Sequence, residues 1–394
     1  MYSEIYKKFF NSKHLAISFT GTILGIITTV ILFLHAMIND QEIVIAKFSI
    51  FLLIFFGTSI LCMLGNDIEI LAKTNNLRKK KIIIDNKIFK LILSLILNIL
   101  LFLIYNNFFH IFVVEITFNE LLVIHIAIFL NNLNRTFQSY IQSSSKLLTN
   151  SILDFSRYVG YAIFLIFWIF KKFQLVGFIF LIGESVTFIS LLFFIVFNYS
   201  QFTFENKKIN FKLNYFILSF SQFAYQGLFK IDILTLALFG NLKLIILYAI
   251  LSNVIEGIVN FITSFHPAMN NLILKNKKNL ISKNDIHNYF SIKKISSFLI
   301  ILIIPSYLIF NYLVFFNFPE FIFLVIVIFL SISVFISKKL FLFYYVYSLY
   351  EKPFNQFLFS IGLLMSNFIL NIILFKLIGL LGIAIATSMS YILF

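Results

Sequence analysis

Three ionisable side chains lie inside two apolar stretches in the middle of the chain, within residues 214–267. Lys230 and Asp232 belong to the first stretch and Glu256 to the second. A charge at the centre of a bilayer costs roughly 2.5–3.5 kcal/mol on insertion scales. These groups therefore need partners or a water-filled cavity, and a cavity of this kind can bind ions or a charged solute.

The second stretch carries its polar side chains on one helical face. Asn253, Glu256, Asn260 and Thr263 follow one another at i, i+3, i+7 and i+10, which keeps them on one side of an α-helix. Amides alone would be explained by hydrogen bonds between packed helices. Four polar groups that include a carboxylate favour the wall of a hydrated cavity.

The first stretch is expected to form one helix over 214–239. Gln222, Gln226 and Lys230 then share a face at i, i+4 and i+8. Asp232 points elsewhere, because residues two positions apart on a helix do not face each other. Asp232 therefore needs a partner from another helix.

Further polar groups lie earlier in the chain. Asp154 and Arg157 are i,i+3 neighbours, so they can pair with each other or serve a functional site. Glu184 is isolated in an apolar stretch and should be hydrogen-bonded. One stripe, which is either a solvated face or part of a site, is formed by Asn131, Arg135, Gln138 and Gln142.

The composition predicts an all-α polytopic membrane protein. The 394 residues are 60% hydrophobic and 12% charged, against about 45–50% and 25% in soluble proteins. Apolar runs of about 20 residues predict spanning helices, whereas barrel strands are about ten residues long. We expect twelve, at about 15–37, 44–64, 86–105, 111–132, 150–170, 174–197, 214–239, 243–266, 295–315, 319–337, 356–375 and 379–394.

A polar linker over 198–213 divides these helices into two sets of six. We expect an N-terminal lobe over 1–205 and a C-terminal lobe over 206–394, with both chain ends cytoplasmic. With that orientation, 24 of the 31 basic residues lie in cytoplasmic segments and five on the other side, as the positive-inside rule requires. Glu115 and Glu120 would then lie near the outer interface, in contact with water.

The sequence excludes several function classes. Every loop is too short for a soluble catalytic domain, and no phosphate-binding GxxxxGK[ST] loop, HExxH or GxSxG motif occurs. The net charge of +15 is accounted for by the basic loops, which argues against a nucleic-acid partner. Cys62 is the single cysteine, so no disulfide or thiolate metal site forms within the chain, and no cofactor is expected.

Three groups of residues form an ordered set that covers both halves of the chain. The first group is Phe229-Lys230-Ile231-Asp232-Ile233-Leu234, Phe239-Gly240, Leu247-Tyr248-Ala249 and Pro267. The second is Asn367-Phe368-Ile369-Leu370-Asn371 with Gly379, Gly382, Ala384 and Ala386-Thr387. The third is Gly65, Asp67 and Ile70-Leu71. Together these groups resemble polysaccharide (O-antigen type) flippases of the MOP exporter superfamily, which are relatives of the MATE transporters.

The resemblance implies two six-helix bundles around a central cavity that opens alternately to the two sides of the bacterial cytoplasmic membrane. It implies a substrate of undecaprenyl-diphosphate-linked oligosaccharide, moved to the outer leaflet for surface polysaccharide synthesis. The partners would be membrane lipids and, in the same process, a polysaccharide polymerase and chain-length proteins.

The residues can be assigned to this expected function. A diphosphate needs cations, for which Lys230, Arg157 and Arg135 are the candidates. Polar side chains that would line the cavity are Gln226, Asn253 and Asn260. Carboxylates that could bind a coupling H⁺ or Na⁺ are Asp232, Glu256 and Asp154.

Two other functions stay open at this point. One is export of small molecules by a MATE-like protein, whose cavity would be acidic if it took amphipathic cations. The other is a membrane-embedded O-antigen polymerase or glycosyltransferase, which should have a sizeable extramembrane loop. The longest loop here, over 268–294, is basic and short, so the enzyme is the weaker alternative.

Overall fold

The structure is a computed structural model of the chain. It describes residues 13–39, 41, 43–73, 82–85, 89–108, 114–144, 146–170, 175–205, 213–228, 230–240, 242–263, 325–326, 328–330 and 353–393.

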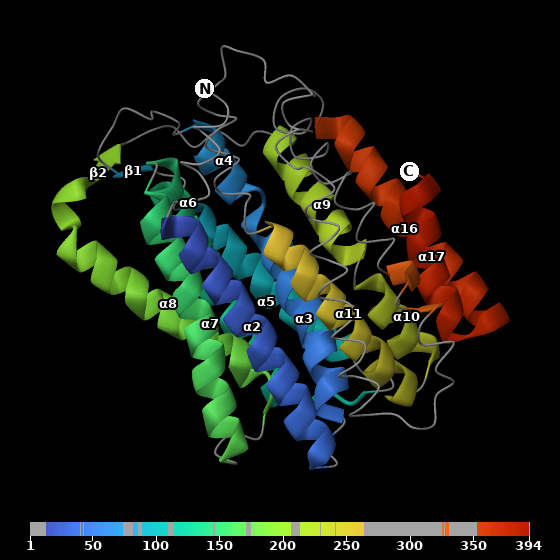
Figure 1. Ribbon diagram of the computed structural model, residues 1–394. Coiled ribbons are helices and arrows are strands. Elements are labelled where there is room, and N and C mark those ends of the chain that lie inside the picture. Colours follow the sequence, from blue (N-terminus) through green and yellow to red (C-terminus); the bar gives the residue numbers. More distant parts are fainter. Residues whose placement is uncertain are drawn as a thin grey trace, which may run out of the picture.

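Helices make up almost all of the described part (Figure 1). Their bounds are α2 Lys13–Ile38, α3 Ile43–Met63, α4 Asn66–Lys73, α5 Lys90–Phe108, α6 Phe118–Ser143, α7 Leu147–Ile169, α8 Phe178–Phe197, α9 Leu213–Leu228, α10 Ile231–Phe239, α11 Leu242–Thr263, α16 Pro353–Ile378 and α17 Leu380–Leu393. Two short strands, β1 Ile82–Asp85 and β2 Phe202–Glu205, and the 3₁₀ turn η3 Tyr199–Gln201 complete the described elements.

Six of the described helices are long and apolar enough to cross a membrane: α2, α3, α5, α7, α8 and α16. α6 is as long as these helices but much more polar, because the buried residues of its second half include Asn131, Asn132, Asn134 and Gln138. Such side chains are tolerated in a spanning helix where they face protein instead of lipid. The prediction of an all-α multi-pass membrane protein is confirmed.

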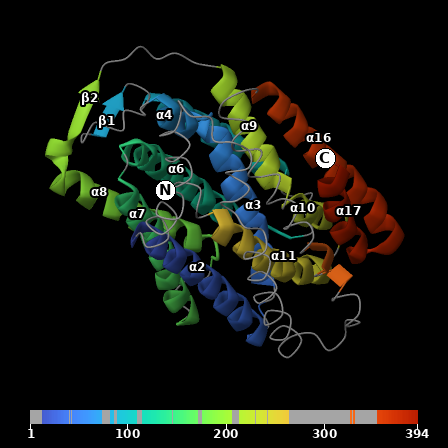
Figure 2. The same ribbon diagram turned by 45° about the horizontal axis from the view of Figure 1, so that its top comes forward.

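The helices pack in two groups. α2 lies along α7, α7 along α8, and α6 touches α3, α5 and α8, whereas α16 packs against α9, α10 and α17 (Figures 1 and 2). α3 joins the groups, because it also contacts α9, α10 and α11. The Ser219 hydroxyl on α9 donates to the Ile60 carbonyl of α3 at 2.9 Å. The first group is built from residues of the expected N-terminal lobe and the second from the C-terminal lobe.

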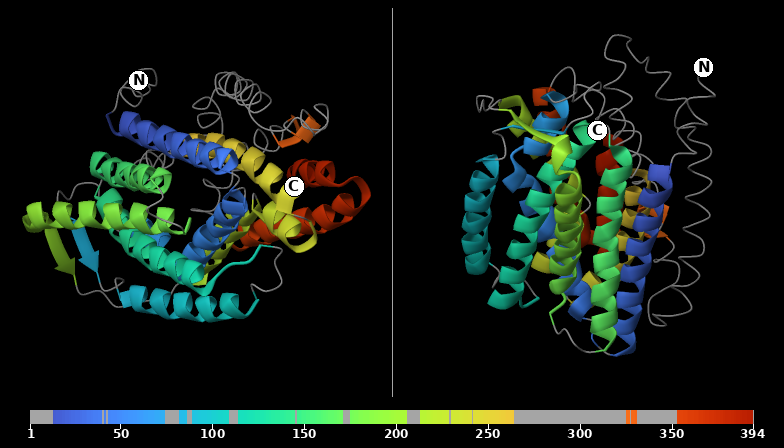
Figure 3. Two further views of the ribbon diagram at one scale, coloured as in Figure 1. Left: turned by 90° about the horizontal axis from the view of Figure 1, so that it is seen from below. Right: turned by 90° about the vertical axis from the view of Figure 1, so that its left-hand side faces the viewer.

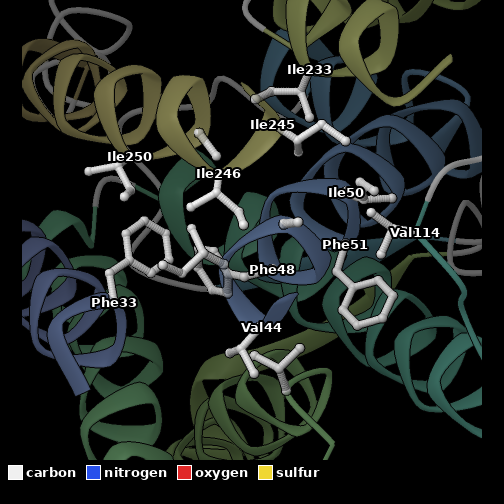
Figure 4. Close-up of a cluster of buried hydrophobic side chains, with 14 of the residues drawn as sticks. Phe33, Val44, Phe48, Ile50, Phe51, Val114, Ile233, Ile245, Ile246 and Ile250 are labelled. Atoms are coloured by element: carbon white, nitrogen blue, oxygen red, sulfur yellow. The ribbon is translucent and has the colours of Figure 1, made fainter. Parts of the chain in front are cut away.

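An apolar core fills the contact between the groups. Phe33 of α2 and Phe48 of α3 lie in one buried cluster with Ile246 and Ile250 of α11 (Figure 4). The Phe48 ring also stacks on Phe180 of α8 at 5.6 Å between centroids. α11 is therefore held against α2 and α3 mainly by apolar burial, which is non-directional.

The strands were not predicted. β1 follows α4, β2 follows α8, and the two pair in parallel with Ile82 opposite Phe202 and Ile84 opposite Phe204. This pairing places the chain after α4 and the chain after α8 side by side at one end of the bundle. Figure 3 shows both strands at the edge of the N-terminal group, away from α16 and α17.

Helix 7 was predicted wrongly as one helix over 214–239. The described chain ends α9 at Leu228 and begins α10 at Ile231. No proline marks this break, so the pattern of apolar residues could not reveal it. The predicted helices at 295–315 and 319–337 lie outside the described residues, apart from five positions at 325–330.

Glu120 was expected to contact water, and this expectation is wrong. α6 begins after Thr117, whose hydroxyl accepts from the Glu120 backbone N–H while the Glu120 carboxylate accepts from the Thr117 backbone N–H. This capping box satisfies backbone donors at the start of the helix. The same carboxylate pairs with Lys47 of α3 at 2.9 Å, and Glu120 is only 3% exposed.

Candidate functional site

The C-terminal group contains a buried carboxylate that is surrounded by hydrogen-bond donors. Asp232 lies in the first turn of α10 and is 2% exposed. Its Oδ1 accepts from the side-chain amides of Asn371 at 2.8 Å and Asn367 at 3.3 Å. Its Oδ2 accepts from the hydroxyls of Thr387 at 2.7 Å and Tyr248. We call these five residues, from α10, α11, α16 and α17, the Asp232 cluster.

Local structure explains how the cluster is assembled. Asn367 and Asn371 are one helical turn apart on α16, so both amides reach the same side. Gly379 takes a φ of +65° between α16 and α17, a conformation that suits glycine. A Cβ on Gly382 would lie 2.2 Å from the Leu374 carbonyl oxygen, so only glycine lets the two helices approach closely enough for Thr387 to reach Asp232.

In the part of the chain that the structure describes, no basic side chain neutralises the charge of this cluster. Among the described residues, no lysine or arginine forms an ion pair with Asp232. Hydrogen bonds to a charged group contribute about 1.5–3 kcal/mol each, so four of them offset much of the cost of a buried carboxylate. The cluster therefore holds one negative charge in place without cancelling it, which leaves an electrostatic demand for a cation.

Lys230 lies at the break between α9 and α10. It is 5% exposed, and its Nζ lies 3.5 Å from the side-chain oxygen of Asn253 on α11. The Asn253 amide donates to the Ser49 hydroxyl of α3 at 3.0 Å. Lys230 is thereby linked through Asn253 to the other group of helices. It does not share a continuous helical face with Gln222 and Gln226, because the helix is interrupted before it.

The N-terminal group contains a different charged cluster. Arg157 of α7 donates from Nε to the Glu184 carboxylate of α8 at 2.6 Å and lies 3.6 Å from Asp154. The Asn134 amide donates to Glu184 at 2.8 Å, and the Gln138 amide donates to Asp154 at 3.0 Å. We call these five residues the Arg157 cluster. Here one guanidinium lies between two carboxylates, so both carboxylates have a cationic partner and one of the two negative charges is cancelled locally.

Two glycines let α7 and α8 come close enough for this ion pair. A Cβ on Gly160 would lie 2.6 Å from the Gly183 Cα, and a Cβ on Gly183 would lie 2.2 Å from the Tyr161 ring. Small residues at a crossing permit close backbone approach in membrane helices. Since Gly183 precedes Glu184 directly and Gly160 follows Arg157 by three residues, the crossing fixes the geometry of the ion pair.

Two further ion pairs join helices at the end of the bundle where α4 lies. Arg135 of α6, whose side chain is 31% exposed, lies 3.5 Å from Asp67 of α4. Glu69 of α4 pairs with Lys90 of α5 in a buried contact. These contacts join α4 to α5 and α6. Of the two basic side chains, Arg135 is more accessible than Lys90.

The structure describes six of the nine predicted site residues in full. It brings Arg157 and Asp154 together, confirming that they can pair, and links Lys230 to Asn253. Asp232 is in a separate cluster, and Arg135 is paired with Asp67. Asn260 and Glu256 lie on α11 and Gln226 lies on α9, but their side chains are outside the described part.

Several contacts were missed at the sequence level. Asn367, Asn371 and Thr387 were recognised only as part of a resemblance, although two amides spaced i,i+4 in an apolar helix are themselves a signal of a polar contact. Glu184 was expected to have a hydrogen-bonded partner, and its partner is Arg157. Gln138, predicted to lie in a stripe that is either a solvated face or part of a site, is 7% exposed and donates to Asp154, so it belongs to the packed interior.

No protein-family model matches this chain, and no curated protein matches its sequence. Solved structures do match it. One, described as the outward-facing conformation of a multidrug resistance MATE family transporter of the MOP superfamily, superimposes with a TM-score of 0.59 at 11% identity, covering 98% of this chain and 94% of the other. The chain has the MATE transporter fold.

A second solved structure, of a MATE protein in the bent conformation, also matches the chain over nearly its whole length. It gives a TM-score of 0.62 at 12% identity and covers 97% of this chain and 96% of the other. Such coverage means that the likeness includes both groups of helices. At this identity the comparison establishes the fold alone.

Proposed function

We propose that the protein is an alternating-access transporter that flips a polyprenyl-diphosphate-linked oligosaccharide across the membrane, coupled to a cation that binds at Asp232. The observation that carries this proposal is the Asp232 cluster, a buried carboxylate on α10 that, among the described residues, receives only neutral donors, which come from α11, α16 and α17. A structural role alone would be served as well by an amide. A retained charge in a membrane protein favours a role in ion or substrate movement.

The chemistry of the cluster favours Na⁺ over H⁺. Hard cations prefer oxygen ligands, and the cluster offers two carboxylate oxygens, two hydroxyls and two amide groups. The side-chain oxygen of Asn371 is buried and has no hydrogen-bond partner among the described residues. A proton would need only the carboxylate, whereas a metal cation would also use this oxygen. Half-helices broken near the middle of the bundle are a recurring place for such ions in transporters.

Occupation of the cluster would act on the contact between the two groups of helices. Tyr248 of α11 donates to Asp232, and α11 packs against α2 and α3. A cation that competes for the Asp232 oxygens changes the bonds that hold α10 against α11, α16 and α17. An ion drives a conformational change only if it binds the two states differently, and these bonds provide such a difference.

The basic residues support an anionic substrate. An ammonium group binds phosphate as a point charge, and Lys230 places one at a helix break beside Asn253, within reach of both groups of helices. Arg135 is the second candidate because it is partly exposed. Arg157 is the weakest candidate of the three, since Glu184 and Asp154 already hold its guanidinium.

Lys230→Ala tests the substrate assignment. The variant should insert normally but lose surface polysaccharide in cells that depend on this transporter, whereas Lys230→Arg should retain a part. Lys243→Ala is the matched control, because Lys243 is an exposed lysine on α11. Normal polysaccharide in cells that carry Lys230→Ala would remove Lys230 from the mechanism.

Export of small molecules is the second candidate, favoured by the multidrug resistance transporter among the structural neighbours. If it is correct, expression of the protein should raise the resistance of a drug-sensitive strain, and Asp232→Asn should abolish the effect. The flippase proposal predicts unchanged drug resistance together with restored polysaccharide in a flippase-deficient strain.

A further inference from the structure

The chain makes a sharp turn between α3 and α4, at Leu64 and Gly65. Their φ angles are +50° and +69°. Glycine adopts a positive φ readily, but a leucine in this conformation is strained because its Cβ lies close to the following carbonyl oxygen. At the same turn, the side-chain oxygen of Asn66 is buried and has no hydrogen-bond partner among the described residues. Strained backbone occurs in segments that switch conformation, so the contacts of this turn bear on how the protein moves.

The turn removes a helical hydrogen bond from the Ile60 carbonyl. In a continuous α-helix, the Leu64 N–H would donate to the carbonyl four residues earlier, which is that of Ile60. Here it donates to the Leu61 carbonyl at 3.3 Å. The Ile60 carbonyl instead accepts from the Ser219 hydroxyl of α9 at 2.9 Å, in a contact that is buried on both sides. A side chain of the C-terminal group thus satisfies one of the last carbonyls of a helix in the N-terminal group.

A second contact lies one turn away on both helices. A Cβ on Gly57 of α3 would lie 3.2 Å from the ring of Phe223 on α9, so this ring packs directly against the glycine. The neighbouring Ser221 shows what is particular about Ser219, because its hydroxyl donates to a carbonyl of its own helix at 3.0 Å, as helical serines commonly do. We call the Ser219–Ile60 and Phe223–Gly57 contacts the α3–α9 latch.

α4 is fixed to the N-terminal group. Its Asp67 and Glu69 form the ion pairs with Arg135 and Lys90 described above. The beginning of α9 lies beside α4 at one end of the bundle (Figures 1 and 2), whereas α3 runs on from this end to contact α10 and α11 as well. Since α4 is held in place, a change of the backbone at Leu64 alters the direction of α3 relative to α4, and it therefore acts on the latch.

We propose that the Ile60 carbonyl is a switch point with two competing donors, the Leu64 N–H and the Ser219 hydroxyl. With the turn formed, as here, the carbonyl accepts from Ser219 and the latch closes the α4 end. When Leu64 becomes helical, its strain is relieved, its N–H donates to the Ile60 carbonyl, and α9 is released so that this end opens. The inference rests on the alternating-access transport proposed above, and it gives Gly65 a role as the residue that permits the turn.

The distance between spin labels on the two groups of helices tests this proposal. Leu148→Cys at the start of α7 and Phe216→Cys at the start of α9 replace exposed side chains, and Cys62→Ser removes the native thiol. Pulsed electron paramagnetic resonance of the labelled protein in nanodiscs then gives the populations with the α4 end closed and open. Ser219→Ala removes one of the two donors. Ser221→Ala is the matched control, since that hydroxyl bonds within its own helix.

Ser219→Ala should raise the ratio of open to closed protein about fivefold, as the loss of one hydrogen bond predicts, and Ser221→Ala should leave it unchanged. Gly65→Ala, which disfavours the turn, should shift the ratio in the same direction as Ser219→Ala. Leu64→Gly, which relieves the strain of the turn, should reverse part of the shift when it is added to Ser219→Ala.

An unchanged ratio in Ser219→Ala, or a shift by Leu64→Gly towards the open form, would overturn the switch. Opposite shifts by Gly65→Ala and Leu64→Gly in a protein that restores no polysaccharide would support the switch and refute the transported substrate instead.

Discussion

The two charge clusters of this protein accommodate carboxylates between helices in opposite ways. In the Arg157 cluster, a guanidinium lies 2.6 Å from Glu184 and 3.6 Å from Asp154, so each carboxylate has a cationic partner within the protein. In the Asp232 cluster, four neutral groups hold one carboxylate. The difference teaches that buried charge in a membrane protein has two uses. A charge that is paired with an opposite charge joins helices. A charge that is held only by neutral hydrogen-bond donors is available to a ligand.

The largest effect on stability should follow removal of the cation of the Arg157 cluster. Arg157→Met leaves Glu184 buried without its partner, which should cost about 3–5 kcal/mol and appear as a lower thermal unfolding midpoint in detergent. The double variant Arg157→Met with Glu184→Gln should recover much of the loss. A single variant as stable as the wild type would contradict the assignment of this cluster to helix packing.

Neutralising the carboxylate of the other cluster should affect coupling and leave stability largely intact. Asp232→Asn keeps the size of the side chain but removes the negative charge that would attract the cation, so cation affinity and cation-driven transport should fall by at least about a hundredfold, or roughly 2.7 kcal/mol. The comparison is Asp154→Asn, which should mainly lower stability. If the two variants had the same phenotype, the distinction between the clusters would fail.

Replacing a glycine at the α7–α8 crossing should lower stability by disturbing the packing of the two helices. Gly160→Ala introduces a Cβ that would lie 2.6 Å from the Gly183 Cα, and overpacking of this kind costs about 1–3 kcal/mol. Gly227→Ala is the control, since its Cβ would meet Leu364 at an ordinary 3.5 Å. Thermal unfolding of both variants measures the difference. Equal unfolding midpoints would show that α7 and α8 can move apart at the crossing without loss of stability.

The smallest effect should come from one donor of the Asp232 cluster. Thr387→Val keeps the shape of the side chain but removes the hydroxyl 2.7 Å from Asp232, which should weaken cation binding by about 1 kcal/mol. Thr235→Val on α10 is the control, because that hydroxyl donates to the Ile231 carbonyl in its own helix. A loss of affinity in the control as large as that in Thr387→Val would contradict a specific role.

The sequence was sufficient for the class of fold and for many of the charged residues that matter. Long apolar runs identify spanning helices because the bilayer has a fixed thickness, and a charge within such a run is conspicuous. What it did not reveal is which charges meet. Asp232 and Thr387 are 155 positions apart, and a helical period specifies a face but not the helix that covers it.

Helix ends and breaks were also difficult to predict. Apolar residues continue through Phe229, so hydropathy shows one helix where the chain forms α9 and α10. The position of Glu120 near the end of a predicted span led to the wrong expectation that it contacts water. Its ion-pair partner Lys47 is 73 residues away in the sequence. In both cases tertiary contacts decided the outcome, and these depend on residues remote in the chain.

Binding of radioactive sodium to the purified protein tests the central claim most directly. The wild type should show saturable binding that protons displace, Asp232→Asn should bind none above background, and Asp154→Asn should bind as the wild type does wherever it folds. Undiminished sodium binding by Asp232→Asn would contradict the assignment of the coupling site, as would a wild type that binds no sodium at all.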